Sequence, residues 1–170
     1  MDHIIIAFDE VSFQLLSSYK RIWFLKGEKP KGAFFWSNKK LLTFAALTSE
    51  HKFYYEFYAA QNSIVFCDFL KIVIEQLDKS KKYVFILDNA AFHKTQLVRD
   101  LIEEQSLWVK LEFIPPYSPE LNPIETCWKV TKNAVTKSQL FQTRREMQIK
   151  LEEFWTKHIF MQEFITYLCP

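Results

Sequence analysis

Three carboxylates that lie far apart in this chain could act together on a metal ion. Asp9 ends the apolar run IIIAFD, Asp88 ends the apolar run YVFILD, and Glu125 follows the proline-rich segment PPYSPELNPI. If the first two runs are neighbouring parallel strands, their aspartates face one another, and two anions so close repel each other unless a cation lies between them. Oxygen ligands without a nearby Cys or His pair favour Mg²⁺ or Mn²⁺. Two such ions ~3.5–4 Å apart can activate a water or hydroxyl and stabilise the leaving oxygen in phosphoryl transfer.

Each acid alone also has a structural interpretation. An Asp after a strand is often a turn residue or a helix cap. A Glu at the margin of a helix's apolar stripe costs free energy unless something pairs with it. The metal-site interpretation is favoured because all three acids fall at expected ends of elements, in a chain order that lets them converge.

The elements that must position these acids are predicted from apolar periodicity. Strands are expected at residues 3–9, 21–25, 41–48, 52–58, 83–87 and 109–114. One helix is expected from Asn62 or Ser63 to about Lys79, and a second over residues 95–105 with Leu97, Leu101 and Ile102 inward. A third helix is expected after the prolines. A last helical region is expected over about 143–168, where a Thr143–Glu146 capping box opens it. We therefore expect one α/β domain over residues 1–170. Its mixed sheet has three antiparallel strands, then two parallel crossover strands, and is flanked by helices.

A proline-stiffened loop determines where Glu125 lies. Three prolines within residues 115–119 restrict the backbone just before the helix. Asn122 is the expected N-cap of that helix, and Pro123 is its expected first residue. Trp128 lies on the inward stripe, where we interpret it as core.

Composition limits the classes of protein that this chain can belong to. Of its 170 residues 49% are hydrophobic and 25% are charged, which indicates a globular protein. Only two glycines occur, so neither a GxGxxG motif nor a P-loop is present. Three scattered cysteines make neither a disulfide framework nor a CxxC zinc site, which favours a reducing cytoplasm. No signal peptide or membrane-spanning run is expected.

Charge is distributed unevenly along the chain, although the net charge is only +2. Within residues 126–150 the charged side chains are Lys129, Lys132, Lys137, Arg144, Arg145 and Lys150 against Glu146 alone. A basic face beside a carboxylate site would suit an enzyme that acts on phosphates. A solvated helix face would show the same charges.

Three segments carry a resemblance to a known family. FDEVSF, LDNAAFH and PPYSPELNPIETCWK resemble the catalytic blocks of DDE transposases, most closely those of the mariner superfamily and related bacterial insertion sequences. The resemblance implies a ribonuclease H-like fold, with Asp9, Asp88 and Glu125 as the catalytic and metal-binding triad for two Mg²⁺ or Mn²⁺ ions. It also implies hydrolysis of a phosphodiester at transposon-end DNA, followed by attack of the freed 3′-hydroxyl on target DNA.

Further residues are expected to bind DNA or to support the site: Asn89, His93, Tyr117, Asn122, Lys129 and Lys132. His93 recurs in the family pattern DNAxxH, and both a phosphate contact and a plain hydrogen bond are open for it. Strand alternation sends Glu10 to the face opposite Asp9, so we interpret it as structural or solvent-facing.

Mariner-like transposases usually carry helix-turn-helix modules ahead of the catalytic domain, whereas here the first catalytic strand begins within a few residues of Met1. We therefore expect the DNA-binding half to be separate or upstream, with the chain a fragment, a frameshift half or a decayed element. We also expect a homodimer in the complex that joins two DNA ends. Two alternatives stay open: a non-catalytic remnant that binds DNA or regulates a related transposase, and a ribonuclease H-like nuclease or resolvase.

Overall fold

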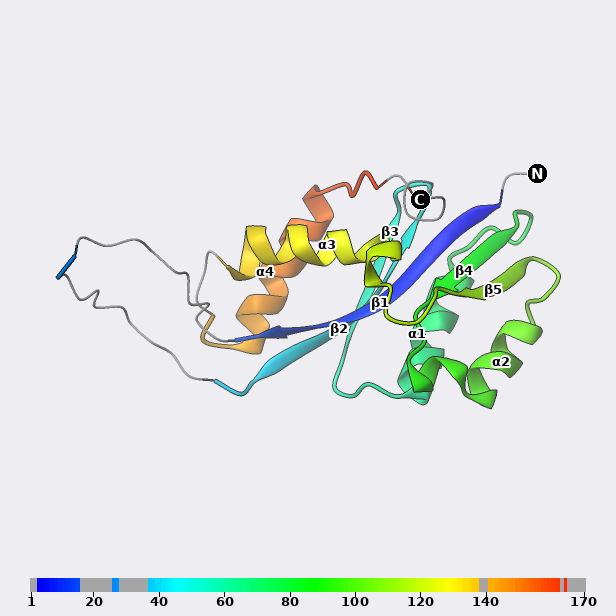
Figure 1. Cartoon of the computed structure of the whole chain (residues 1–170), viewed down its shortest axis with the longest axis horizontal. Coiled ribbons are helices and arrows are strands. Elements are labelled where there is room, and N and C mark those ends of the chain that lie inside the picture. The colour runs from blue at the N-terminus through cyan, green and yellow to red at the C-terminus, as the bar shows by residue number, and fades with distance from the viewer. Residues whose placement is uncertain (1–2, 16–25, 28–36, 138–140, 163, 165–170) are drawn as a thin grey trace.

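A five-stranded mixed sheet lies at the centre of the fold, with strand order β3-β2-β1-β4-β5 (Figure 1). The computed structural model describes residues 3–15, 26–27, 37–137, 141–162 and 164. The strands are β1 (Ile4–Gln14), β2 (Lys40–Thr48), β3 (Phe53–Tyr58), β4 (Tyr83–Leu87) and β5 (Val109–Phe113). β2 pairs antiparallel with both β1 and β3, whereas β4 pairs parallel with both β1 and β5. This arrangement confirms the predicted mixed sheet. The strand expected at residues 21–25 lies outside the described residues.

Helices cover both faces of this sheet. They are α1 (Ser63–Glu75), the 3-10 turn η1 (Ala91–Lys94), α2 (Gln96–Glu103), the 3-10 turn η2 (Pro119–Leu121), α3 (Ile124–Thr131), the π-helical turn η3 (Lys132–Thr136) and α4 (Arg144–Lys157). In Figure 1, α1 and α2 lie on one side of the sheet, and α3 and α4 lie on the other. Within the described residues, no helix has the length and apolarity needed to cross a membrane.

β1 is longer than its apolar run predicts. The expected end at Asp9 is wrong, because β1 stays paired with β2 as far as Gln14, which lies opposite Lys40. The shorter β4 ends at Leu87, and its last pair with β1 joins Ile86 to Ala7. Asp9 therefore lies inside β1 but beside the point where β4 ends.

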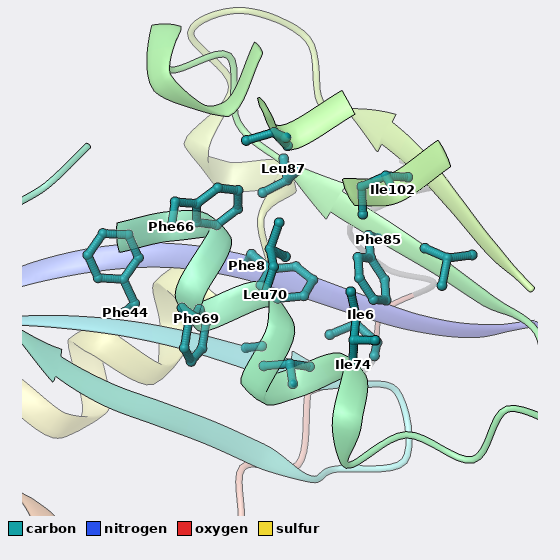
Figure 2. Packing of buried hydrophobic residues seen from close by; sticks show 14 of the residues in the cluster. Ile6, Phe8, Phe44, Phe66, Phe69, Leu70, Ile74, Phe85, Leu87 and Ile102 are labelled. Atoms are coloured by element: carbon teal, nitrogen blue, oxygen red, sulfur yellow. The ribbon is translucent and has the colours of Figure 1, made fainter. Parts of the chain in front are cut away.

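Side-chain alternation along β1 divides the core into two clusters. Ile6 and Phe8 belong to the cluster that α1 covers, shown in Figure 2. Ala7, Val11 and Phe13 belong to the second cluster, which contains residues of α3 and α4 such as Trp128. By the same alternation, Asp9 faces α3 and Glu10 faces α1.

α1 begins where predicted and ends earlier. The Asn62 side chain accepts the N–H of Val65 at 3.0 Å, which is the expected N-cap. The helix ends at Glu75 rather than near Lys79. Just beyond that end, the Asp78 side chain accepts the N–H of Ser80 at 2.9 Å. A local turn of this kind competes with helix formation.

α2 is shorter than predicted, because Thr95 is its N-cap rather than its first residue and the helix already ends at Glu103. Val98 and Ile102, four residues apart, are its buried residues. The inward assignment of Leu97 is wrong, since its side chain is 47% exposed. A residue one position before Val98 points about 100° away from it around the helix.

α4 opens with the predicted capping residue. Thr143 Oγ1 accepts the N–H of Glu146 at 3.1 Å, and Met147, Leu151 and Trp155 are buried. The helical region expected to continue to about residue 168 is wrong for residues 158–162, which are not helical, and most of the remainder lies outside the described residues.

Leu151 and Ile149 test the packing of α4 against the sheet. Leu151 is fully buried, whereas Ile149 is 39% exposed on the same helix. We expect Leu151→Ala to lower the free energy of unfolding by about 2–5 kcal/mol, because it leaves a cavity in the core. Ile149→Ala should cost less than about 1 kcal/mol. Urea unfolding measures both, and equal losses would contradict the packing described.

Candidate active site

A cavity of about 360 Å³ lies where β4 ends. Asp9, Asp88 and Glu125 all line it, so the structure brings together the three acids that the sequence singled out. The remaining lining residues are Asn89, Ala90, Ile114, Pro115, Pro116, Tyr117, Ser118, Pro119 and Asn122. The proline-rich loop thus forms one wall of the cavity that holds the acids.

Each acid arrives from a different element. Asp9 comes from the middle of β1 and faces α3, and Asp88 follows the last residue of β4. Glu125 lies in the first turn of α3. The parallel pairing of Ala7 with Ile86 places Asp9 and Asp88 at corresponding positions, two residues further along each strand.

Asn122 joins the start of α3 to β1. Its side-chain amide donates to the carbonyl oxygen of Phe8 at 3.1 Å, and it is 2% exposed. The backbone carbonyl oxygen of Asn122 accepts the N–H of Glu125 at 3.1 Å. The expected helix start is wrong by one residue: Pro123 occupies the N-cap position, and α3 begins at Ile124. Asn122 lies just before that cap, and its side-chain oxygen accepts the N–H of Ile124 at 3.4 Å while its amide nitrogen donates to β1.

Trp128 makes a second bond between α3 and β1. Its indole N–H donates to Asp9 Oδ2 at 2.7 Å. The sequence predicts that Trp128 belongs to the core, which is confirmed for its ring at 2% exposure. The contact with Asp9 was not predicted. Two signals could have found it: a buried indole N–H needs an acceptor, and Trp128 follows Glu125 by three residues on a helix.

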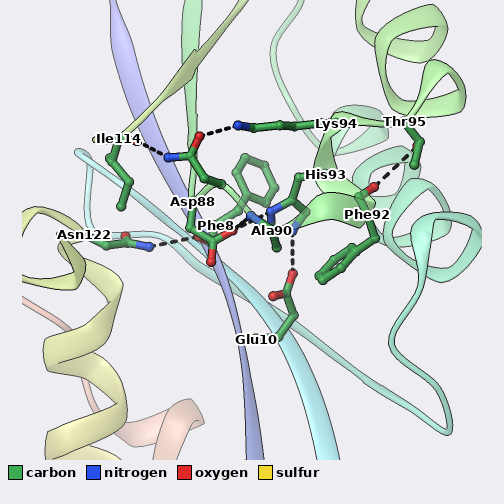
Figure 3. Close-up of polar contacts among 11 residues, drawn as sticks. Phe8, Glu10, Asp88, Ala90, Phe92, His93, Lys94, Thr95, Ile114 and Asn122 are labelled. Atoms are coloured by element: carbon green, nitrogen blue, oxygen red, sulfur yellow. Dashed lines mark hydrogen bonds and ion pairs between the residues drawn. The ribbon is translucent and has the colours of Figure 1, made fainter. Parts of the chain in front are cut away.

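Asp88 is held from the other side of the sheet (Figure 3). Its Oδ1 accepts the backbone N–H of Ala90 at 2.9 Å and lies 2.7 Å from His93 Nδ1. The other ring nitrogen of His93 lies 2.9 Å from Glu10 Oε1. The His93 side chain is fully buried, which leaves no surface for a phosphate contact, and Glu10 is 5% exposed. Glu10 therefore takes the structural role of the two that the sequence allowed.

The remaining predicted residues lie around the cavity. The Asn89 amide donates to the carbonyl of Ile114 and accepts from Lys94, so it links the ends of β4 and β5. Tyr117 is fully exposed on the proline loop. Lys129 is exposed on α3. The charge of Lys132 acts to lower the pKa of Glu125.

The acids on the α3 side resist ionisation. Burial raises the pKa of Asp9 to about 8, and the charges of Glu10 and Glu125 contribute. The bond from Trp128 acts in the opposite direction. Partial desolvation also raises the pKa of Glu125, the charge of Lys132 opposes this shift, and the smaller effect of the Asp88 charge adds to it. These acids therefore repel one another across the cavity.

Asp88 behaves differently because of His93. The hydrogen bond from His93 lowers the pKa of Asp88 in spite of partial burial. Burial opposes a charge on His93, but its bonds to Asp88 and Glu10 outweigh burial and raise its pKa to about 9. The His93 imidazole therefore holds a proton more firmly than a free imidazole does.

The donor set fits a hard divalent cation by its chemistry. Three carboxylates line one cavity without a cysteine, and carboxylate oxygens are the ligands that Mg²⁺ and Mn²⁺ prefer. A cation would also offset the repulsion that raises the pKa values of Asp9 and Glu125. However, among the described residues no three His, Cys, Asp or Glu side chains converge on one point. Asp9 and Asp88 are instead hydrogen-bonded to protein donors. The three acids therefore share one cavity, as expected, but their carboxylates do not meet at a single point in it.

The chain that forms this cavity is similar to known proteins over most of its length. Residues 4–148 match the family described as DDE superfamily endonuclease. The chain belongs to this family. Among individual proteins, it is 23% identical over 154 residues to the insertion element IS630 uncharacterized 39 kDa protein of Shigella sonnei, which covers 90% of this chain and 45% of that protein. The chain spans about half the length of the curated relatives it matches, 45% and 56%.

Solved structures share the fold of this DDE superfamily chain. A Mos1 transposase paired-end complex with left transposon end superposes with a TM-score of 0.77 at 20% identity, covering 92% of this chain and 49% of that one. The catalytic domain of Mos1 mariner transposase superposes with a TM-score of 0.67 at 20% identity, covering 92% and 72%. The ribonuclease H-like α/β fold expected from the sequence is thereby confirmed.

The pKa of Asp9 generates a prediction about stability. Its pKa of about 8 in the folded state exceeds the value of 3.8 for an unperturbed aspartate in the unfolded chain, so between these values the folded state holds a proton that the unfolded state has lost. That contribution is fully present below 3.8 and is lost as the pH rises through about 8. In EDTA, the free energy of unfolding should fall over this range, and it should fall less for Asp9→Asn. Asp100→Asn, on the exposed side of α2, is the control, and parallel pH curves for Asp9→Asn and wild type would contradict the prediction.

Proposed function

We propose that this chain is the catalytic domain of a DNA transposase. It would hydrolyse a phosphodiester at the end of a transposable element and transfer the freed 3′-hydroxyl into target DNA. The observation that carries the proposal is the cavity lined by Asp9, Asp88 and Glu125 in a chain of the DDE superfamily endonucleases. The Mos1 fold relatives are transposase structures, one of them holding a transposon end.

In this proposal Asp9, Asp88 and Glu125 hold two Mg²⁺ or Mn²⁺ ions. Structures of the Mos1 paired-end complex are described with Mn and with Mg. Bound ions would supply an activated water or hydroxyl and would stabilise the leaving oxygen. Trp128 holds Asp9, and α3 carries Glu125 to the same cavity. Lys129 and Lys132 lie one and two turns after Glu125, where they would contact DNA phosphates.

The partners follow from the same proposal. The substrate is DNA, both transposon ends and target, and two copies of the chain would act together to join two ends. A separate or upstream helix-turn-helix half would choose the DNA sequence, and the protein would act in the cytoplasm on chromosomal DNA. The alternatives of a regulatory remnant and of a host nuclease have no observation in their favour among the described residues.

Asp88→Asn tests the proposed function. The change keeps the size of the side chain and removes the charge that a metal ion needs. We expect cleavage of element-end DNA in Mg²⁺ or Mn²⁺ to fall by more than about a hundredfold, because Asp88 is proposed as a direct ligand and loss of an outer partner alone costs about 10–100-fold. Asp100→Asn should cleave like wild type. Equal cleavage by Asp88→Asn and wild type would remove Asp88 from the mechanism.

A further inference from the structure

A buried carboxylate and a buried imidazole stand behind Asp88 (Figure 3). His93 lies 2.7 Å from Asp88 Oδ1 and 2.9 Å from Glu10 Oε1, through its two different ring nitrogens. The His93 side chain is fully buried and that of Glu10 is 5% exposed. Neither side chain lines the cavity, so neither can touch the DNA that the cavity would hold.

Simple packing does not account for these two side chains. Aromatic rings enclose His93, with centroid distances of 4.3 Å to Phe66 and 4.2 Å to Phe92. An apolar side chain would fill such surroundings without the free-energy cost of burying polar and charged groups. A fully bonded buried polar chain instead fixes one arrangement of its members. The member that reaches the cavity is Asp88.

We propose that Glu10 and His93 are positioning residues that hold Asp88 in the orientation used for metal binding. The inference rests on the proposed function, because it requires Asp88 to bind a divalent cation. Within the described residues, the hydrogen bonds to Asp88 come from Ala90 and His93 and both reach Oδ1. This pair of bonds fixes the carboxylate and leaves Oδ2 for a ligand in the cavity.

Glu10 orients the His93 ring in this arrangement. Its Oε1 lies 2.9 Å from one ring nitrogen, while the other ring nitrogen lies 2.7 Å from Asp88 Oδ1. A ring held at both nitrogens cannot turn away from Asp88 without losing a buried hydrogen bond. Leucine at position 10 would lose this bond, whereas glutamine would keep an oxygen that can accept it.

The test uses the full chain and Mn²⁺ alone, without DNA. Isothermal titration calorimetry measures the Mn²⁺ affinity of wild type, Glu10→Leu, Glu10→Gln and His93→Gln. We expect Glu10→Leu and His93→Gln to bind Mn²⁺ about 10–100-fold more weakly, as is typical for losing an outer partner of a metal ligand. Glu10→Gln keeps an acceptor for His93 and should bind Mn²⁺ almost as tightly as wild type, and thermal melting shows that each variant is folded. Glu56→Gln on β3 and His51→Gln, which removes a histidine bonded to the Phe160 carbonyl, are matched controls that should bind normally.

The outcomes separate the inference from the proposed function. A folded Glu10→Leu that binds Mn²⁺ as tightly as wild type would overturn the positioning role, while the metal site would stand. Wild type that binds no Mn²⁺ would overturn both. The comparison of Glu10→Gln with Glu10→Leu is a readout that a merely structural role would not move. We expect Glu10→Gln to restore the Mn²⁺ affinity, and equal weakening in the two folded variants would overturn the role of the hydrogen bond.

Tyr117 has a backbone conformation that tyrosine rarely adopts. Its φ is 59°, in the left-handed region. It follows Pro116 in a turn, at a position where a positive φ normally selects Gly or Asn. Its side chain is fully exposed, so packing of the ring does not compensate for the strain. Strained residues that serve no packing role are found at functional sites.

The place of Tyr117 indicates which ligand its ring would contact. It lines the same cavity as Asp88 and Glu125. Exposed aromatic rings bind single-stranded or frayed nucleic acid by stacking on bases, whatever the base. We infer that Tyr117 stacks on a nucleobase next to the phosphodiester that enters the cavity. This inference also rests on the proposed function, because it requires a DNA substrate.

The fluorescence of 2-aminopurine, which stacking quenches, tests this contact. EDTA keeps the DNA uncut, and the probe base is placed at the element end in one duplex and inside a target duplex in another. Tyr117→Phe should quench like wild type, and Tyr117→Ala should lose the quenching and bind about tenfold more weakly. Leu107→Ala, which removes a side chain that is 90% exposed between α2 and β5, should change neither. Quenching in one duplex only would assign the stacked base to the element end or to the target.

Two results would overturn the stacking role of Tyr117. One is DNA binding and quenching that are the same in Tyr117→Ala and Tyr117→Phe. The other is a lower melting temperature in Tyr117→Gly, since glycine relieves the positive φ and should raise it unless the ring packs. Wild type that binds neither duplex would overturn the proposed function as well.

Discussion

The attachment of α3 to β1 is the constraint on which the site depends. β4 stops at Leu87, so the Phe8 carbonyl lies just past the last β1–β4 pair, and Asn122 donates to it at 3.1 Å. Two turns of chain later, Trp128 donates to Asp9 at 2.7 Å. Glu125 lies between these two bonded positions. Its place in the cavity is therefore determined by contacts that its neighbours make with β1.

The same attachment brings acids together at a cost in stability. The pKa of Asp9 is raised to about 8 by burial and by the charges of Glu10 and Glu125. Such conflict between local electrostatics and folding is expected where function requires it. A bound divalent cation would remove the conflict and would stabilise the folded state, because it binds that state alone.

Two adjacent residues of β1 serve opposite faces of the sheet. Asp9 turns toward α3, where Trp128 holds it, and Glu10 turns toward α1, where His93 holds it. His93 then reaches Asp88 at the end of β4. The alternation of a single strand thus connects one acid of the cavity directly to α3 and another to the core behind the sheet.

Local patterns in the sequence determined the order of strands and helices, the caps at Asn62 and Thr143, and the three acids as candidates. These features depend on neighbouring residues, through apolar runs, capping side chains and proline geometry. Pairing across the sheet decided the rest. Asp9 lies inside β1 because pairing with β2 extends that strand past it. Trp128 contacts Asp9 across 119 positions of the chain, and His93 contacts Glu10 across 83 positions. Periodicity tells which face a side chain occupies, but only the folded chain decides which donor or acceptor lies opposite it.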